Sequence, residues 1–80
     1  MRHFEYKDLT ENSSKFWEVN LESKKLIVTY GRIGINNPAI KTYIFPTANS
    51  KEGFKTKEDA KKFCEKKIRE KINKGYVEIN

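Results

Sequence analysis

Residues 30–34 read Tyr-Gly-Arg-Ile-Gly, and they are the part of the chain best suited to binding chemistry. Two glycines flank Arg32 directly after an apolar run, which indicates a bent strand end where the backbone approaches another molecule and the guanidinium projects. The segment is not a dinucleotide-binding fingerprint, because the third glycine and the following helix are missing. A glycine bulge with a solvated arginine explains the same residues. The segment alone leaves both interpretations open.

Basic side chains concentrate in residues 56–74, where eight Lys and Arg stand against four Asp and Glu in a chain of net charge +6. Such an excess favours a surface for phosphates. For the helix taken by itself, a solvated surface with Glu–Lys pairs four residues apart is the better explanation. Lys67 and Lys71 interrupt the apolar stripe of this segment, so we expect their stems to pack and their ammonium groups to pass the sheet edge. The alternative is that they reach a carboxylate, a helix-end carbonyl or a bound anion near Gly75.

This composition contains few of the residues that enzymes use for catalysis. His3 is the one histidine and Cys64 the one cysteine, so neither a nucleophile–base pair nor a metal cluster can be assembled. We therefore expect no enzymatic activity, no metal and no cofactor. Cys64 is expected to be a buried, inert thiol, and Trp17 a core aromatic rather than a ligand platform.

The elements that must position these residues follow from hydrophobic periodicity. Alternating residues predict strands around Phe4, Trp17 and Val28, with a fourth strand after residues 36–38. Residues 47–55 are polar and predict a solvated loop. Apolar residues then recur with helical spacing, which predicts a helix with one apolar face: Ala60, Phe63, Cys64, Ile68 and Ile72. Thr56 and Asp59 predict a capping box at its start, and Gly75 predicts a cap in the left-handed conformation at its end.

This pattern predicts an α+β fold: a curved four-stranded antiparallel meander, one amphipathic helix packed on it and a short C-terminal strand at residues 76–79. With 80 residues and 36% hydrophobic side chains, we expect a single domain over residues 1–80. No apolar run approaches the ~20 residues that cross a bilayer, and the N-terminus lacks a secretory signal. A single cysteine fits a reducing compartment, so we expect a cytoplasmic protein without a membrane partner.

The ordered series of motifs resembles the WGR domain family, named for a Trp-Gly-Arg tripeptide. The resemblance runs from Lys15-Phe16-Trp17 through residues 30–34 and Lys41, and its most specific part is the helical segment Thr-Lys-Glu-Asp-Ala at 56–60, Phe63, and residues 65–71 and 73–76. The family is best known from DNA-dependent poly(ADP-ribose) polymerases and also occurs in bacterial proteins labelled molybdate metabolism regulators. It implies a non-catalytic module in which a sheet carries one packed helix.

The resemblance also implies a binding site. In the polymerases the module engages a DNA break near the 5′-phosphate, the tripeptide's aromatic stacks on a terminal sugar and its arginine makes polar contacts. By position these residues are Tyr30 and Arg32, while Ser14 or Lys15, together with Lys41, match positions that face the DNA backbone. Tyr30 stands where the family name has Trp, and residues 47–55 are longer than in the polymerases. ADP-ribosylation and NAD binding are not carried over, because we expect no catalytic domain here.

The sequence thus predicts a non-catalytic nucleic-acid-binding module that acts on DNA ends or nicks through phosphate contacts and stacking. We favour DNA over RNA as the partner. The alternative is a protein-interaction or regulatory module whose Gly-Arg surface docks an acidic partner or a neighbouring domain.

Overall fold

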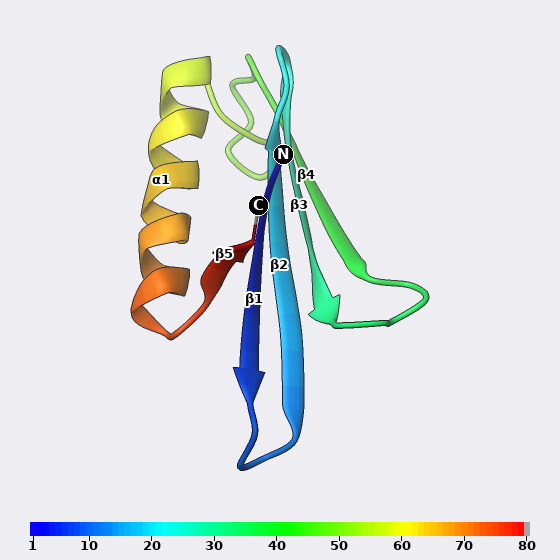
Figure 1. Ribbon diagram of the computed structural model, residues 1–80. Coiled ribbons are helices and arrows are strands. Elements are labelled where there is room, and N and C mark those ends of the chain that lie inside the picture. The colour runs from blue at the N-terminus through cyan, green and yellow to red at the C-terminus, as the bar shows by residue number, and fades with distance from the viewer. Residues whose placement is uncertain (80) are drawn as a thin grey trace.

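The computed structural model describes residues 1–79 and contains one sheet and one helix (Figure 1). Its elements are β1 (Arg2–Asp8), β2 (Ser13–Leu21), β3 (Lys25–Arg32), β4 (Ala39–Ile44), α1 (Lys57–Asn73) and β5 (Val77–Ile79). The strands lie in the order β4-β3-β2-β1-β5, and every neighbouring pair is antiparallel. The predicted α+β meander with its helix is confirmed. The C-terminal strand joins the sheet beside β1, so the sheet has five strands.

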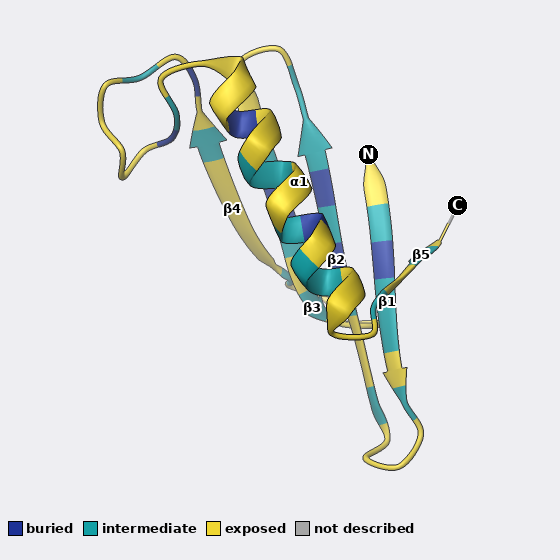
Figure 2. Ribbon diagram, turned by 90° about the vertical axis from the view of Figure 1, so that its left-hand side faces the viewer, coloured by how far each residue is buried: buried dark blue, intermediate teal, exposed yellow. Residues whose placement is uncertain are grey.

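The register of the strands gathers the apolar side chains on one face of the sheet. Figure 2 shows α1 lying across this sheet. Phe4 lies opposite Trp17, with ring centroids 5.7 Å apart, and Val19 lies opposite Val28. Side chains alternate along each strand, so this pairing gathers large apolar groups from three strands on one face. The buried core consists of Phe4, Trp17, Val19, Leu26, Val28, Phe45, Ala60 and Ile68. Trp17 is therefore a core residue, as predicted.

Capping residues fix both ends of α1. The Oγ of Thr56 accepts a hydrogen bond from the Asp59 amide at 3.1 Å, which satisfies one of the free N–H groups of the first turn. Gly75 follows the helix with φ +105°, a left-handed conformation that glycine adopts without the cost of a Cβ atom. The two caps set where the helix begins and ends.

The prediction that Ile72 belongs to the apolar face of the helix is wrong, because its side chain is 51% exposed. An α-helix turns ~100° per residue, so Ile72, twelve residues after Ala60, has rotated about 120° away from it. Lys71 lies about 20° from Ala60 on the same wheel. The lysine, and not the isoleucine, therefore faces the sheet at the end of α1, where it is partly buried.

The segment 47–55 is not only a solvated loop. Its Phe54 packs against Tyr43 and Phe63, with ring centroids 5.5 and 5.2 Å apart. The same segment bonds to the end of β4: the Ile44 amide donates to the Glu52 carbonyl, and the Phe54 amide donates to the Ile44 carbonyl, both at 2.9 Å. The polar composition of the segment hid this aromatic anchor.

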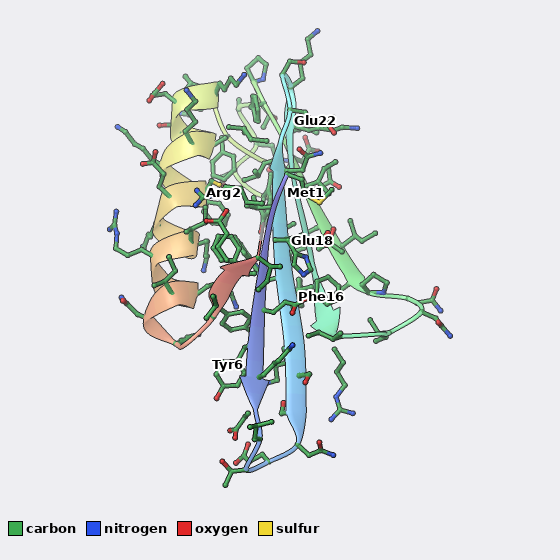
Figure 3. The ribbon with its side chains drawn as sticks, in the orientation of Figure 1. Met1, Arg2, Tyr6, Phe16, Glu18 and Glu22 are labelled. Atoms are coloured by element: carbon green, nitrogen blue, oxygen red, sulfur yellow. The ribbon has the colours of Figure 1, made fainter. Side chains whose placement is uncertain are left out.

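The face of the sheet opposite α1 carries a charged cluster around His3. Figure 3 shows Phe16 and Glu18 extending from β2 on that side, whereas Arg2 and Tyr6 extend from β1 toward the helix. The His3 ring stacks on Phe16 with centroids 5.8 Å apart, and its Nδ1 and Nε2 lie 2.7 Å from Glu18 and 2.9 Å from Glu5. Ionised carboxylates only accept hydrogen bonds, so His3 donates to both carboxylates at once only in its protonated form. The bonds to Glu5 and then Glu18 raise the pKa of His3 above 6.5, against the opposing effect of burial.

This cluster makes folding stability depend on pH. Because the pKa of His3 is higher in the folded chain than the ordinary 6.5, its contribution is complete below that value and is lost as the pH rises through the folded-state pKa. The free energy of unfolding, measured by urea titration from about pH 5 to about pH 9, should fall across this window in the wild type. In His3→Gln the fall should be reduced. Identical pH profiles for the two proteins would contradict the assignment.

No helix within residues 1–79 is long and apolar enough to cross a membrane.

Candidate nucleic-acid interface

A groove of about 230 Å³ lies between the C-terminal half of α1 and the covered face of the sheet. Trp17 and Val28 form its floor, Tyr30, Lys41 and Tyr43 line the sheet side, and the helix side contributes Phe63, Lys67, Glu70, Lys71 and Lys74. Aromatic and aliphatic surface thus lies beneath a rim of ammonium groups. That combination can hold a flat or sugar-like group below and an anion at the rim.

Two further hollows continue this groove around the end of α1. One, of about 210 Å³, lies between Lys71 and Tyr76 on one side and the strand residues Lys15, Tyr30 and Arg32 on the other. The second, of about 360 Å³, passes Tyr6, Lys15 and Lys74 toward the tip of the β1–β2 hairpin. Lys71 borders all three hollows. We call the continuous surface the basic groove and define it by Lys15, Tyr30, Arg32, Lys41, Lys71 and Lys74.

Lys71 is the central cation of the basic groove. Its Nζ lies 5.1 Å from the ring centroid of Tyr76 and 6.0 Å from that of Trp17, so its charge rests over two aromatic faces. Burial, and then the nearby Lys74 and Lys67 charges, lower the pKa of Lys71. Among residues 1–79 no carboxylate lies within 4.0 Å of its Nζ. A bound anion would supply the charge that the protein itself does not.

Lys67 behaves differently from Lys71. Its Nζ lies 3.4 Å from Glu70 and 5.7 Å from the Phe63 ring centroid, so a carboxylate on the next turn already balances it. Both lysine stems pack on the sheet side of the helix, as expected. The negative end of the helix dipole repels an acidic ligand only near the last turn of α1, where the free carbonyls lie. Lys71 and Lys74 lie at this end and offset that negative charge.

The sheet register gathers four of the five sequence-predicted site residues on the helix side. Lys15 lies opposite Arg32, and Trp17 lies opposite Tyr30, so Lys15, Tyr30 and Arg32 share one face. Lys41 of β4 lies opposite Val28 of β3 and borders the groove beside Tyr30, which is 39% exposed. Ser14 is exposed on the other face of β2. Its carbonyl accepts the Ile33 amide at 3.0 Å, and it does not border the basic groove.

The contributions of Lys74, Tyr76 and Tyr6 to this surface escaped the sequence analysis. Tyr6 and Tyr76 pack together with ring centroids 5.5 Å apart, and both border the hollow of about 360 Å³. One signal was available for the helix end. Lys71 interrupts the apolar stripe four residues before the Gly75 cap.

Cys64 is half-buried, not fully buried as expected. It lies beside a hollow that Arg2, Val19, Leu21 and Ile68 border, on the side of α1 away from the basic groove. Burial raises the pKa of the thiol, which disfavours the reactive thiolate. Within residues 1–79 no group of three or more His, Cys, Asp and Glu is arranged to hold a metal ion.

The family model described as the WGR domain matches residues 1–80. No curated protein and no solved structure matches the chain.

Proposed function

This chain belongs to the WGR domain family, a family of non-catalytic modules that generally bind nucleic acid, and we propose that it binds nucleic acid through the basic groove. The observation that carries the proposal is the convergence of Lys15, Arg32, Lys41, Lys71 and Lys74 on one aromatic-floored surface. Phosphates and sugars need these two features together: cations for the backbone charge and flat rings for the stacking contact.

The size of the groove favours a nucleotide at a DNA end or nick over a continuous duplex. Each hollow measures a few hundred cubic ångströms, the scale of a small ligand. The helix rises along one side of Tyr30, so a ring or sugar on Tyr30 would come from a strand terminus that can enter beside α1. Its 5′-phosphate would then lie between Arg32 and Lys71, which border the same hollow.

The contacts expected in such a complex are sequence-independent. Lys and Arg at the rim would meet phosphate oxygens, and Tyr30 would meet the terminal sugar. The basic groove offers Lys and Arg side chains and aromatic rings, which the phosphates and sugars of any base sequence can meet. We therefore expect discrimination between ends, nicks and intact duplexes, and little discrimination among base sequences.

Replacing Tyr30 with alanine should weaken binding to a 5′-phosphorylated nicked duplex by ~1–3 kcal/mol, if stacking on a sugar resembles stacking on a base. The replacement removes no charge, so the dependence of affinity on salt should stay the same. Fluorescence anisotropy at several salt concentrations measures both quantities. The control is Tyr30→Trp, which keeps a stacking face. If Tyr30→Ala binds as tightly as the wild type, the stacking contact is wrong.

The proposal as a whole is tested by mapping amide shifts with three ligands: a 5′-phosphorylated nicked duplex, an intact duplex and a single-stranded RNA. We expect the nicked duplex to give the largest shifts, at Lys15, Tyr30, Arg32 and the last turn of α1. Absence of shifts with all three ligands would contradict nucleic-acid binding and favour the alternative, a module that docks an acidic protein on the Gly-Arg surface.

A further inference from the structure

The backbone of β4 forms one edge of the sheet, and half of its hydrogen-bonding groups point away from β3. The Ile44 amide and carbonyl bond outward to the segment 52–54, whereas the next residue, Phe45, donates inward to the Lys24 carbonyl at 3.0 Å. Alternate residues of an antiparallel strand direct their groups to the same side. Ile40 and Thr42 therefore direct their N–H and C=O groups outward, as Ile44 does, and within residues 1–79 no backbone group bonds to them.

The side chains along this edge divide by face. Ile40 and Ile44 lie on the face away from α1 and are 63% and 43% exposed. Lys41 lies between them in sequence and on the helix side. A strand that paired with β4 would thus meet aliphatic side chains on one face and a cation on the other. Exposed aliphatic groups beside unpaired backbone groups are the features that let an edge accept a further strand.

At the opposite edge of the sheet, the pairing of β5 with β1 shows which pattern of residues can cover an exposed strand. There β5 pairs with β1, and its residues alternate as Val77, Glu78 and Ile79. Val77 and Ile79 lie on the face away from α1, and Glu78 lies on the helix side opposite Phe4. The Arg2 guanidinium donates two hydrogen bonds to Glu78 at 2.7 and 2.9 Å, and they lower the pKa of that carboxyl. An apolar–acidic–apolar strand thus covers an edge whose helix-side cation is arginine.

We propose that the edge of β4 binds an extended segment of a partner protein with the same apolar–acidic–apolar alternation. The segment adds antiparallel to β4 and exchanges hydrogen bonds with Ile40 and Thr42. Its apolar side chains continue the aliphatic row of Ile40 and Ile44, and its carboxylate lies opposite Lys41. Residues opposite each other in such a non-hydrogen-bonded pair have close side chains, which suits an ion pair. This surface lies beside the basic groove and shares Lys41 with it.

A second copy of the chain does not fit this edge. The antiparallel pairing that uses both Ile40 and Thr42 places Lys41 directly opposite Lys41 of the copy, and like charges in that position are destabilising. Shifting the register by one pair toward residue 44 meets groups that Glu52 and Phe54 already occupy. Shifting it the other way meets Pro38, which has no N–H to donate. The net charge of +6 further opposes self-association and favours an acidic partner.

The test uses the peptide Thr-Val-Glu-Val-Thr and its variant with both valine nitrogens methylated, titrated into the isotope-labelled chain. The parent peptide should shift the amides of residues 39–42 and slow their hydrogen exchange. Methylation keeps every side chain but removes the two N–H groups that face Ile40 and Thr42, so it should weaken binding by roughly tenfold or more. Equal binding of the two peptides would overturn the proposal, because simple charge attraction does not depend on those groups.

A matched pair of protein variants gives an independent readout. Thr42→Pro removes one outward N–H without breaking the pairing with β3, so the chain should melt within a few degrees of the wild type and lose the peptide. Thr42→Val keeps the N–H and should keep the peptide. Charge exchange completes the set: Lys41→Glu should reject the parent peptide and accept one with lysine in place of glutamate. Shifts centred on Lys15 and Arg32, or no binding at millimolar peptide, would overturn the proposal.

Discussion

Replacing Phe4 with alanine is expected to remove most of the folding stability of the protein. Phe4 is fully buried at the centre of the covered face, against Trp17 and the Arg2 guanidinium, whose carbon lies 5.5 Å from the ring centroid. Removing a buried phenyl ring costs ~3–5 kcal/mol, from the lost transfer of the ring and the cavity that remains. A domain of this size has a total stability near the lower end of ~5–15 kcal/mol, so the loss consumes most of it.

Circular dichroism and a urea titration measure this effect directly. The control is Leu9→Ala at the hairpin tip, where the side chain is 96% exposed and the change should stay within about 0.5 kcal/mol. If Phe4→Ala melts within a few degrees of the wild type, the packing of β1 against Trp17 is not the centre of the core.

Replacing Lys71 with methionine should weaken nucleic-acid binding roughly tenfold or more while leaving the protein at least as stable as the wild type. Methionine keeps an unbranched stem that packs on Trp17 and Tyr76. It removes a charge that folding disfavours, as the lowered pKa of Lys71 indicates. The lost contact with a phosphate is a charge-assisted hydrogen bond, which accounts for the loss of affinity.

The two readouts therefore move in different directions, and a misfolded variant would be recognised by its melting curve. Lys66→Met is the matched control, because Lys66 is exposed on α1 and does not border the basic groove. Unchanged affinity in Lys71→Met would show that the C-terminal end of α1 is not part of the binding site. A large loss of stability would show that the Lys71 charge supports the fold.

Several parts of the fold could be predicted from the sequence because they depend on local patterns. Alternation around Trp17 and Val28 identified the strands, and Thr56 and Gly75 identified the ends of the helix. Ile72 was misplaced because its spacing of four residues drifts from the helical period over three repeats. Phe54 was missed because its neighbours are polar and its partners, Tyr43 and Phe63, come from a strand and a helix on either side of it.

Less of the candidate site than of the fold could be predicted from the sequence. The resemblance supplied Tyr30, Arg32 and Lys41, but it left Ser14 and Lys15 as alternatives. Side chains alternate along a strand, so a choice between adjacent residues depends on the register, which pairs Lys15 with Arg32 across β2 and β3. The convergence of Lys71 and Lys74 on the same surface depends on where the helix lies across the sheet. That placement comes from long-range packing and is not written in any local motif.

The measurement that tests the basic groove most directly compares two triple variants in the salt dependence of DNA affinity. One is Lys15→Ala/Arg32→Ala/Lys41→Ala in the groove, and the other is Lys57→Ala/Lys62→Ala/Lys66→Ala on exposed positions of α1. Each removes three positive charges from the chain, so both change the net charge equally. A phosphate contact contributes about 0.9 to the slope of log affinity against log salt, so the groove variant should flatten the slope by roughly 2.7. The helix variant should leave it nearly unchanged. Equal flattening by both variants, or greater flattening by the helix variant, would contradict the basic groove as the binding surface.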